Sequence, residues 1–239
     1  AGISKLPIIP VAAQSSLNID ALIGAVEETI ETPTRDESKD TVLHVLRSFD
    51  INKPGTKIKN LNGGVIGGSL TQGKFSIGDE IEIKPGIQNE KKKNYQSIHT
   101  EIVSLGTGAG IVDVVKPGGL VAIGTKLDPS LTRSDSLIGS VIGKPDTLPE
   151  NSTGAKLQVH LFDTAVGSAG ETKVTPIKVD ELLRVSVGTA PVPAKVTKVT
   201  SDNIEIEFKR PVCIFAKGSV ALSRRIAERW RLIGAGVID

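Results

Sequence analysis

Short runs of alternating apolar and polar residues, bounded by glycine, proline and asparagine, recur along most of this chain. Their length and their period of two residues are typical of β-strands. Between residues 41 and 145 the pattern predicts strands at Val42–Phe49, Gly64–Leu70, Glu80–Lys84, Ile98–Leu105, Gly119–Gly124 and Leu137–Ile142. Between residues 152 and 239 it predicts strands at Ala155–Leu161, Thr172–Ile177, Asp180–Val187, Ala194–Val199, Asn203–Phe208, Ser219–Ile226 and Arg231–Ile238. We therefore predict a mainly β protein with two antiparallel β-barrels, one in residues 41–145 and one in residues 152–239.

The first 31 residues have a different pattern. The apolar run Leu6–Val11 predicts a short strand, and apolar residues recur at helical spacing from Leu22 to Ile30, after a capping residue at Asn18 or Asp20. One strand and one helix cannot bury a core, so we expect residues 1–31 to be the last βα unit of a larger domain. The polar segments 32–40 and 145–153 predict linkers.

One segment of the first barrel predicts a particular turn. Gly73–Gly86 is expected to form a hairpin that turns at Gly78 and Asp79, with Ile81 and Ile83 alternating inward.

The composition excludes several classes of protein. Hydrophobic residues make up 38% and charged residues 23%, which is ordinary for a globular protein, and the net charge of +2 does not require a nucleic-acid partner. The single cysteine, Cys213, excludes an internal disulfide and a zinc site built from several cysteines. No run approaches the roughly 20 apolar residues that a membrane-spanning helix needs. Because the chain begins at Ala1 and contains no methionine, we expect a fragment or a processed product.

No set of catalytic residues is evident, because His44, His99 and His160 lie singly within strand patterns and no phosphate-binding loop occurs. Arg47 interrupts an apolar strand, so it either forms an ion pair or contacts a partner.

A basic hairpin is the second candidate and consists of Arg224, Arg225, Arg229, Trp230 and Arg231. At strand spacing Arg225, Arg229 and Arg231 are expected to share a face, which could contact phosphate or an acidic partner. The alternative is a surface hairpin whose Trp230 packs on the barrel.

Several longer strings resemble the gamma subunit of archaeal and eukaryotic translation initiation factor 2, a translational GTPase family. They are V-L-R-S-F-D-I-N-K-P-G at Val45–Gly55, G-G-V-I-G-G-S at Gly63–Ser69, G-D-E-I-E-I-K-P-G at Gly78–Gly86, P-G-G-L-V-A-I-G-T-K-L-D-P at Pro117–Pro129 and A-L-S-R-R-I-A-E-R-W-R-L-I-G-A-G at Ala221–Gly236. The resemblance implies barrels like domains II and III of elongation factor Tu. An elongation factor of the Tu or selenocysteine-specific type, or a scaffold that docks only proteins, is the alternative.

The resemblance also implies a role for the first residues. Ala12, Ala13 and Gln14 are similar to the last guanine-binding motif of the family, with alanine at position 12 where the family has serine. The intact family member is a GTPase that binds GTP and Mg²⁺ through upstream motifs, so this chain alone is expected neither to bind nor to hydrolyse GTP.

The partners implied by the resemblance are the alpha and beta subunits of a heterotrimer, methionyl initiator tRNA and the small ribosomal subunit, in the cytoplasm. Arg47 and Lys53 are candidates for contact with the tRNA. The exposed loop Asn52–Asn62 is the candidate for docking of the alpha subunit, through Asn52, Lys53, Pro54, Gly55, Lys57, Lys59 and Asn60.

Overall fold

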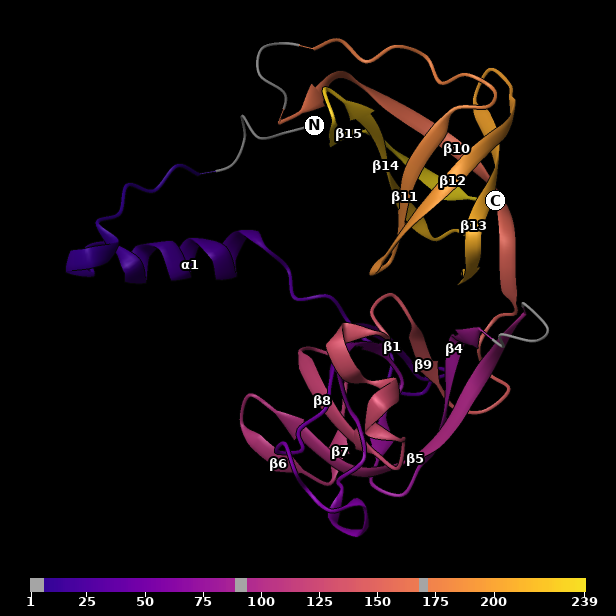
Figure 1. Cartoon of the computed structure of the whole chain (residues 1–239). Helices are drawn as coiled ribbons and strands as arrows, with labels where there is room; N and C mark the ends of the chain where they lie inside the picture. Colours follow the sequence, from indigo (N-terminus) through magenta and orange to yellow (C-terminus); the bar gives the residue numbers. More distant parts are fainter. Residues whose placement is uncertain (1–6, 89–93, 168–171) are drawn as a thin grey trace. The chain divides into compact units, whose positions relative to one another are not determined.

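The computed structural model describes residues 7–88, 94–167 and 172–239 (Figure 1). Residues 1–35 form one unit and residues 36–239 another. No helix in the described ranges has the length and apolar character that crossing a membrane requires.

The first unit contains the predicted helix but not the predicted strand. Helix α1 spans Ile19–Thr29 and follows a 3-10 turn at Ala13–Ser15. Residues 7–11 are not a strand, and only an isolated bridge joins Ala12 to Leu17. A strand needs a partner to pair with, and the described residues of this unit provide none, so the predicted strand is wrong. α1 buries no residue, so its apolar stripe is exposed.

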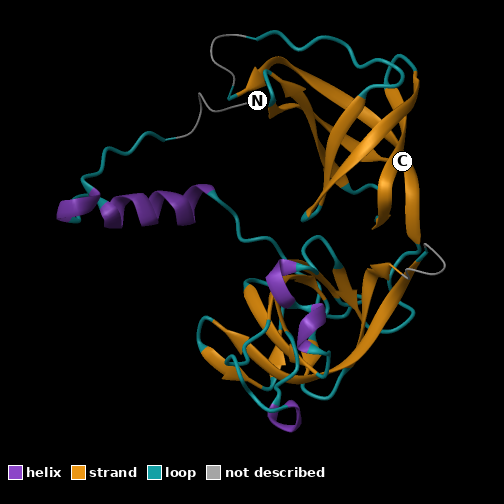
Figure 2. Cartoon of the chain, viewed as in Figure 1, coloured by secondary structure: helices purple, strands orange, loops and turns teal. Residues whose placement is uncertain are grey.

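The first barrel is built from six strands that close into a ring (Figures 1 and 2). They are β1 (Val42–Phe49), β2 (Val65–Gln72), β4 (Glu80–Gln88), β5 (Tyr95–Thr107), β8 (Leu120–Thr125) and β9 (Val141–Gly143). The order is β4-β9-β1-β2-β8-β5, and pairing of β4 with β5 closes the ring. β6 (Gly110–Val112) pairs with β5 alone. Residues 89–93, which join β4 to β5, lie outside the described residues.

The core of this barrel consists of the inward residues of the alternating runs. Ile81 and Ile83 are fully buried, as predicted. The predicted hairpin is wrong, because β3 (Phe75–Ser76) pairs with β7 (Val114–Val115) and not with β4. The predicted strand Leu137–Ile142 is a strand only from Val141, since turns precede it. Two short 3-10 turns, Pro129–Leu131 and Arg133–Asp135, lie between β8 and β9.

The second barrel is also closed by six strands, so the prediction of two antiparallel β-barrels is confirmed. The strands are β10 (Asn151–Val166), β11 (Leu182–Val187), β12 (Ala190–Val199), β13 (Asn203–Cys213), β14 (Ser219–Ile226) and β15 (Arg229–Ile238). The predicted strand Thr172–Ile177 is wrong, because only an isolated bridge from Thr164 to Lys173 forms there. Residues 168–171 before it lie outside the described residues.

Candidate functional site

Arg47 lies on β1 and is held by a carboxylate from a distant part of the sequence. Its Nε donates to both carboxylate oxygens of Asp135, at 2.9 and 3.1 Å. The Arg47 side chain is 67% exposed. Its terminal NH₂ groups donate no hydrogen bond to any residue in the described ranges. Arg47 is therefore fixed at one edge and free to contact a partner at the other.

Asp135 is itself held by the backbone of β1. Its Oδ1 accepts a hydrogen bond of 2.9 Å from the Ser48 amide. The buried Ser48 hydroxyl in turn accepts one from the Leu137 amide at 3.1 Å. The hydrogen bond from Arg47, followed by the one from the Ser48 amide, lowers the pKa of Asp135, so this carboxylate is ionised at neutral pH.

An apolar groove of about 580 Å³ lies beside Arg47 on the first barrel. Large apolar side chains that reach solvent line it: Leu46, Phe49, Ile111 and Leu120. Gly67 of β2 and the glycines of the β5–β6 hairpin carry no side chain that could fill it, and Gly67 lies opposite Arg47 in the register of β1 and β2. Arg47 is the one charged residue of this lining. The groove can therefore take an apolar group that has an anion next to it.

The loop Asn52–Asn62 is closed at its base by one asparagine. The side-chain Nδ2 of Asn52 donates to Asp50 Oδ1 and to the Asn62 carbonyl. The Asn52 Oδ1 accepts from the Asn62 backbone amide at 2.8 Å. Lys53 and Thr56 end a turn in which Gly55 has φ of 84°. Beyond the turn Ile58 is 89% exposed. Of the predicted docking residues, Asn52 holds the loop, while the lysines reach solvent.

Ala12, Ala13 and Gln14 lie in an exposed turn of the first unit. No group of three or more His, Cys, Asp and Glu side chains in the described ranges is arranged to hold a metal ion.

The basic hairpin is divided between two faces. In the β14–β15 register Arg224 lies opposite Arg231, and Arg225 lies opposite Trp230. Directly opposite residues of an antiparallel pair share a face. Arg229 and Arg231 therefore share a face with Arg224, and the predicted grouping of Arg225 with them is wrong. The two-residue turn Ala227-Glu228 sets this register, which spacing along one strand does not give.

Arg224 is a structural residue and not a free cation. Its guanidinium pairs with both carboxylate oxygens of Glu181 and donates to the carbonyls of Thr175 and Pro176. Arg225 pairs with Glu228 in the turn and remains exposed, as does Arg229. Of the exposed residues, Arg225 and Trp230 share one face of the hairpin, whereas Arg229 lies on the other face.

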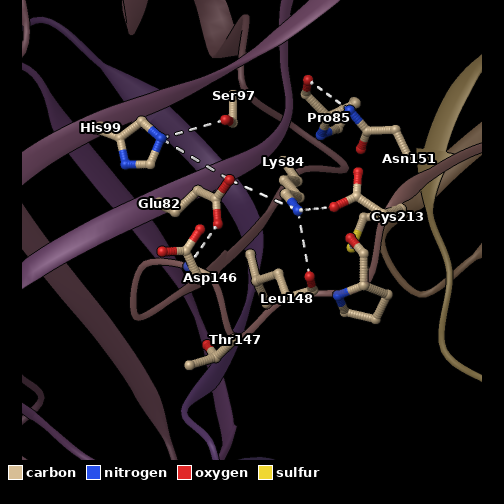
Figure 3. A network of polar contacts seen from close by, with 12 residues as sticks. Glu82, Lys84, Pro85, Ser97, His99, Asp146, Thr147, Leu148, Asn151 and Cys213 are labelled. Carbon is tan, nitrogen blue, oxygen red and sulfur yellow. Dashed lines mark hydrogen bonds and ion pairs between the residues drawn. The ribbon is translucent and has the colours of Figure 1, made fainter.

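A buried ion network was missed by the sequence analysis (Figure 3). Lys84 Nζ lies 3.7 Å from Glu82 Oε1 and donates to the Leu148 carbonyl at 3.2 Å. Glu82 also accepts from the Asp146 amide, and His99 lies 3.9 Å from it. Glu82 and Lys84 alternate with the inward isoleucines, so the pattern predicts that they face solvent. They are buried because the segment between the barrels, which contains Asp146 and Leu148, lies over them. No periodic signal indicates such a cover.

Comparisons with known proteins agree with one another. A protein-family model described as "Initiation factor eIF2 gamma, C terminal" matches residues 153–238. A translation initiation factor 2 subunit gamma of Archaeoglobus fulgidus is 49% identical over 97% of this chain and 54% of its own length. The subunit of Aeropyrum pernix is 50% identical over 97% of this chain and 57% of its own. The chain thus spans about half the length of these curated relatives.

A solved structure supports the fold alone. The crystal structure of a bacterial selenocysteine-specific elongation factor has a TM-score of 0.72 at 14% identity, and the match covers 97% of this chain and 33% of that one.

Proposed function

Because this chain belongs to the gamma subunit family of translation initiation factor 2, we propose that its barrels form part of a tRNA carrier. The intact subunit, with GTP and Mg²⁺, delivers methionyl initiator tRNA to the small ribosomal subunit in the cytoplasm. In the intact subunit, Ala12, Ala13 and Gln14 would lie against the guanine base of GTP. The first barrel holds the aminoacylated end of the tRNA.

The groove beside Arg47 is the observation that carries this proposal. A methionine side chain is apolar and flexible and suits a groove lined by Leu46, Phe49 and Leu120. The tRNA end also brings phosphates, and the free NH₂ groups of Arg47 can donate charge-assisted hydrogen bonds to one of them. Lys53, exposed in its turn, is a second candidate for phosphate contact.

Arg47→Ala in the complete subunit is expected to weaken binding of methionyl initiator tRNA by roughly 1–3 kcal/mol, about 5- to 150-fold in Kd, the range for a hydrogen bond to a charged group. The Kd is measured at low salt with a non-hydrolysable GTP analogue. Lys198→Ala, which removes another exposed ion-paired cation, serves as the control and leaves the Kd unchanged. An unchanged Kd for Arg47→Ala contradicts the assignment.

The alpha subunit is proposed to dock on the loop Asn52–Asn62, and the beta subunit to bind elsewhere on the intact protein. The loop offers a protein partner the exposed Ile58 between two lysines, on a base that Asn52 holds. Apolar and charged groups on a fixed loop are typical of docking surfaces.

Replacing Lys57, Ile58 and Lys59 with alanine is expected to weaken alpha binding roughly tenfold or more, as for an interface hot spot. Calorimetry with isolated alpha subunit measures the effect. Because Asn52 is kept, the melting temperature is expected to stay unchanged. Alpha affinity equal to that of the parent chain would exclude this loop.

Arg225 and Trp230, which are exposed on the same face of the β14–β15 hairpin, are proposed to contact ribosomal RNA, tRNA or another part of the intact subunit. Arginine can pair with phosphates, and tryptophan offers a flat face for stacking. A contact with RNA weakens steeply as the salt concentration rises, which distinguishes it from a contact between domains.

A further inference from the structure

We propose that Asp135 is a positioning residue for tRNA binding, which aims the Arg47 guanidinium at the tRNA end. This inference rests on the proposed function of the groove. Asp135 makes no contact with the tRNA end in this proposal, and it acts only through Arg47.

The hydrogen bonds fix which edge of the guanidinium is used. Arg47 Nε meets both oxygens of Asp135, so the edge that carries Nε points to the barrel. A guanidinium is planar, and fixing one edge fixes the direction of the remaining donors. An arginine with two-thirds of its side chain exposed would otherwise sample many rotamers and lose entropy on binding.

The Asp135 carboxylate is held by two donors from β1. Its Oδ1 receives the Ser48 amide as well as Arg47 Nε, both at 2.9 Å, so neighbouring residues of β1 grip the same oxygen. The Asp135 carbonyl accepts from the Ile138 amide at 3.0 Å. The carboxylate can therefore not follow Arg47 if that side chain swings away.

The backbone at this point is unusual. Ser134 and Asp135 have φ of 56° and 59°, in the left-handed region that residues other than glycine rarely adopt. Two successive left-handed residues place this carboxylate against β1. Strained conformations of this kind persist where surrounding structure holds them, often at binding sites.

A purely structural role is the competing explanation, because Asp135 also caps the Ser48 amide. Under that explanation, the loss of the carboxylate disturbs β1 whether or not Arg47 is present. Under the positioning role, the loss matters for tRNA only while Arg47 is present. The two explanations therefore differ in the coupling between the residues and not in the single substitution.

The test is a double-mutant cycle in the complete subunit, with the Kd for methionyl initiator tRNA as the readout. Asp135→Asn keeps the shape and one acceptor for the Ser48 amide, but it removes the charge that orients Arg47. We expect this substitution to raise the Kd about tenfold when Arg47 is present, and less than about twofold in the Arg47→Ala background. Asp36→Asn alters an Asp that also accepts from a backbone amide, that of Ser38 at 2.9 Å, and is expected to have no effect.

Each result decides the question. If Arg47→Ala alone leaves the Kd unchanged, the proposed function of the groove fails, and this inference fails with it. If Arg47→Ala weakens binding but Asp135→Asn does not, or if Asp135→Asn weakens it equally in both backgrounds, the groove assignment stands and the positioning role is overturned. Melting temperatures of all four proteins show whether any loss of affinity comes from unfolding.

Discussion

Lys84→Met is expected to lower the free energy of unfolding by about 3–5 kcal/mol, the range for removing one partner of a buried ion pair. Lys84 is 6% and Glu82 4% exposed. Without the ammonium group, Glu82 stays buried, and its remaining polar neighbours among the described residues are the Asp146 amide and the more distant His99. Glu150 also lies 3.5 Å from Lys84, but its side chain is 97% exposed and contributes little.

Urea unfolding of this chain measures the loss, and two further variants identify its cause. Lys126→Met breaks the exposed pair with Glu101, whose side chains are 60% and 40% exposed, and is expected to cost less than about 1 kcal/mol. Glu82→Gln combined with Lys84→Met removes both charges and is expected to recover most of the stability. A loss of under about 1 kcal/mol for Lys84→Met would show that the buried pair is not what holds the segment.

Cys213 gives a local readout of the same substitution. Its thiol donates to the Pro149 carbonyl at 3.6 Å, in the segment that Lys84 binds through Leu148. Burial raises the pKa of Cys213 to about 11, so it reacts slowly with alkylating agents. Because it is the single cysteine of the chain, its alkylation rate reports on this segment alone. The Lys84 charge lowers the pKa of Cys213, so its loss by itself slows alkylation, and the faster rate that we expect in Lys84→Met therefore reports opening of this segment. No change is expected in Lys126→Met.

The alternation of apolar and polar residues is sufficient to predict the barrels, but not the segments that lie over their outer faces. Ile81 and Ile83 point inward as their period requires, and the period correctly places Glu82 and Lys84 on the other face. What the period cannot show is that a segment more than 60 residues later lies over that face. Burial of these two charges is a tertiary property, set by chain segments that are distant in sequence.

The candidate site shows the same limit. Arg47 was identified because a charge interrupts an apolar strand, whereas its partner Asp135 is 88 residues away and has no local signal. The grouping of Arg225 with Arg229 and Arg231 was wrong because spacing along one strand does not give the register across a turn. The strand predicted at residues 7–11 was wrong because a strand forms only with a partner, and the described residues of its unit provide none.

Arg224→Ala is expected to lower the free energy of unfolding by roughly 2–3 kcal/mol, somewhat below the value for a fully buried pair. Arg224 and Glu181 side chains are 15% and 19% exposed, and their atoms meet at 2.5 and 3.1 Å. The substitution also removes the donors for the Thr175 and Pro176 carbonyls, at 2.9 and 3.4 Å. These bonds hold residues 172–181, which form no strand. The conformation of this segment therefore depends on the Arg224 side chain of β14.

Arg225→Ala is the matched control, since it removes the adjacent arginine of the same strand. The side chains of Arg225 and its partner Glu228 are 60% and 82% exposed, so the pair is expected to contribute less than about 1 kcal/mol to the free energy of unfolding. Urea unfolding compares the two variants, and hydrogen exchange of residues 172–181 tests the local effect. Faster exchange there is expected only in Arg224→Ala, because Arg225 lies on the opposite face of the hairpin. Equal losses in the two variants would mean that Arg224 acts as a surface charge, and that packing of the barrel core alone orders the segment.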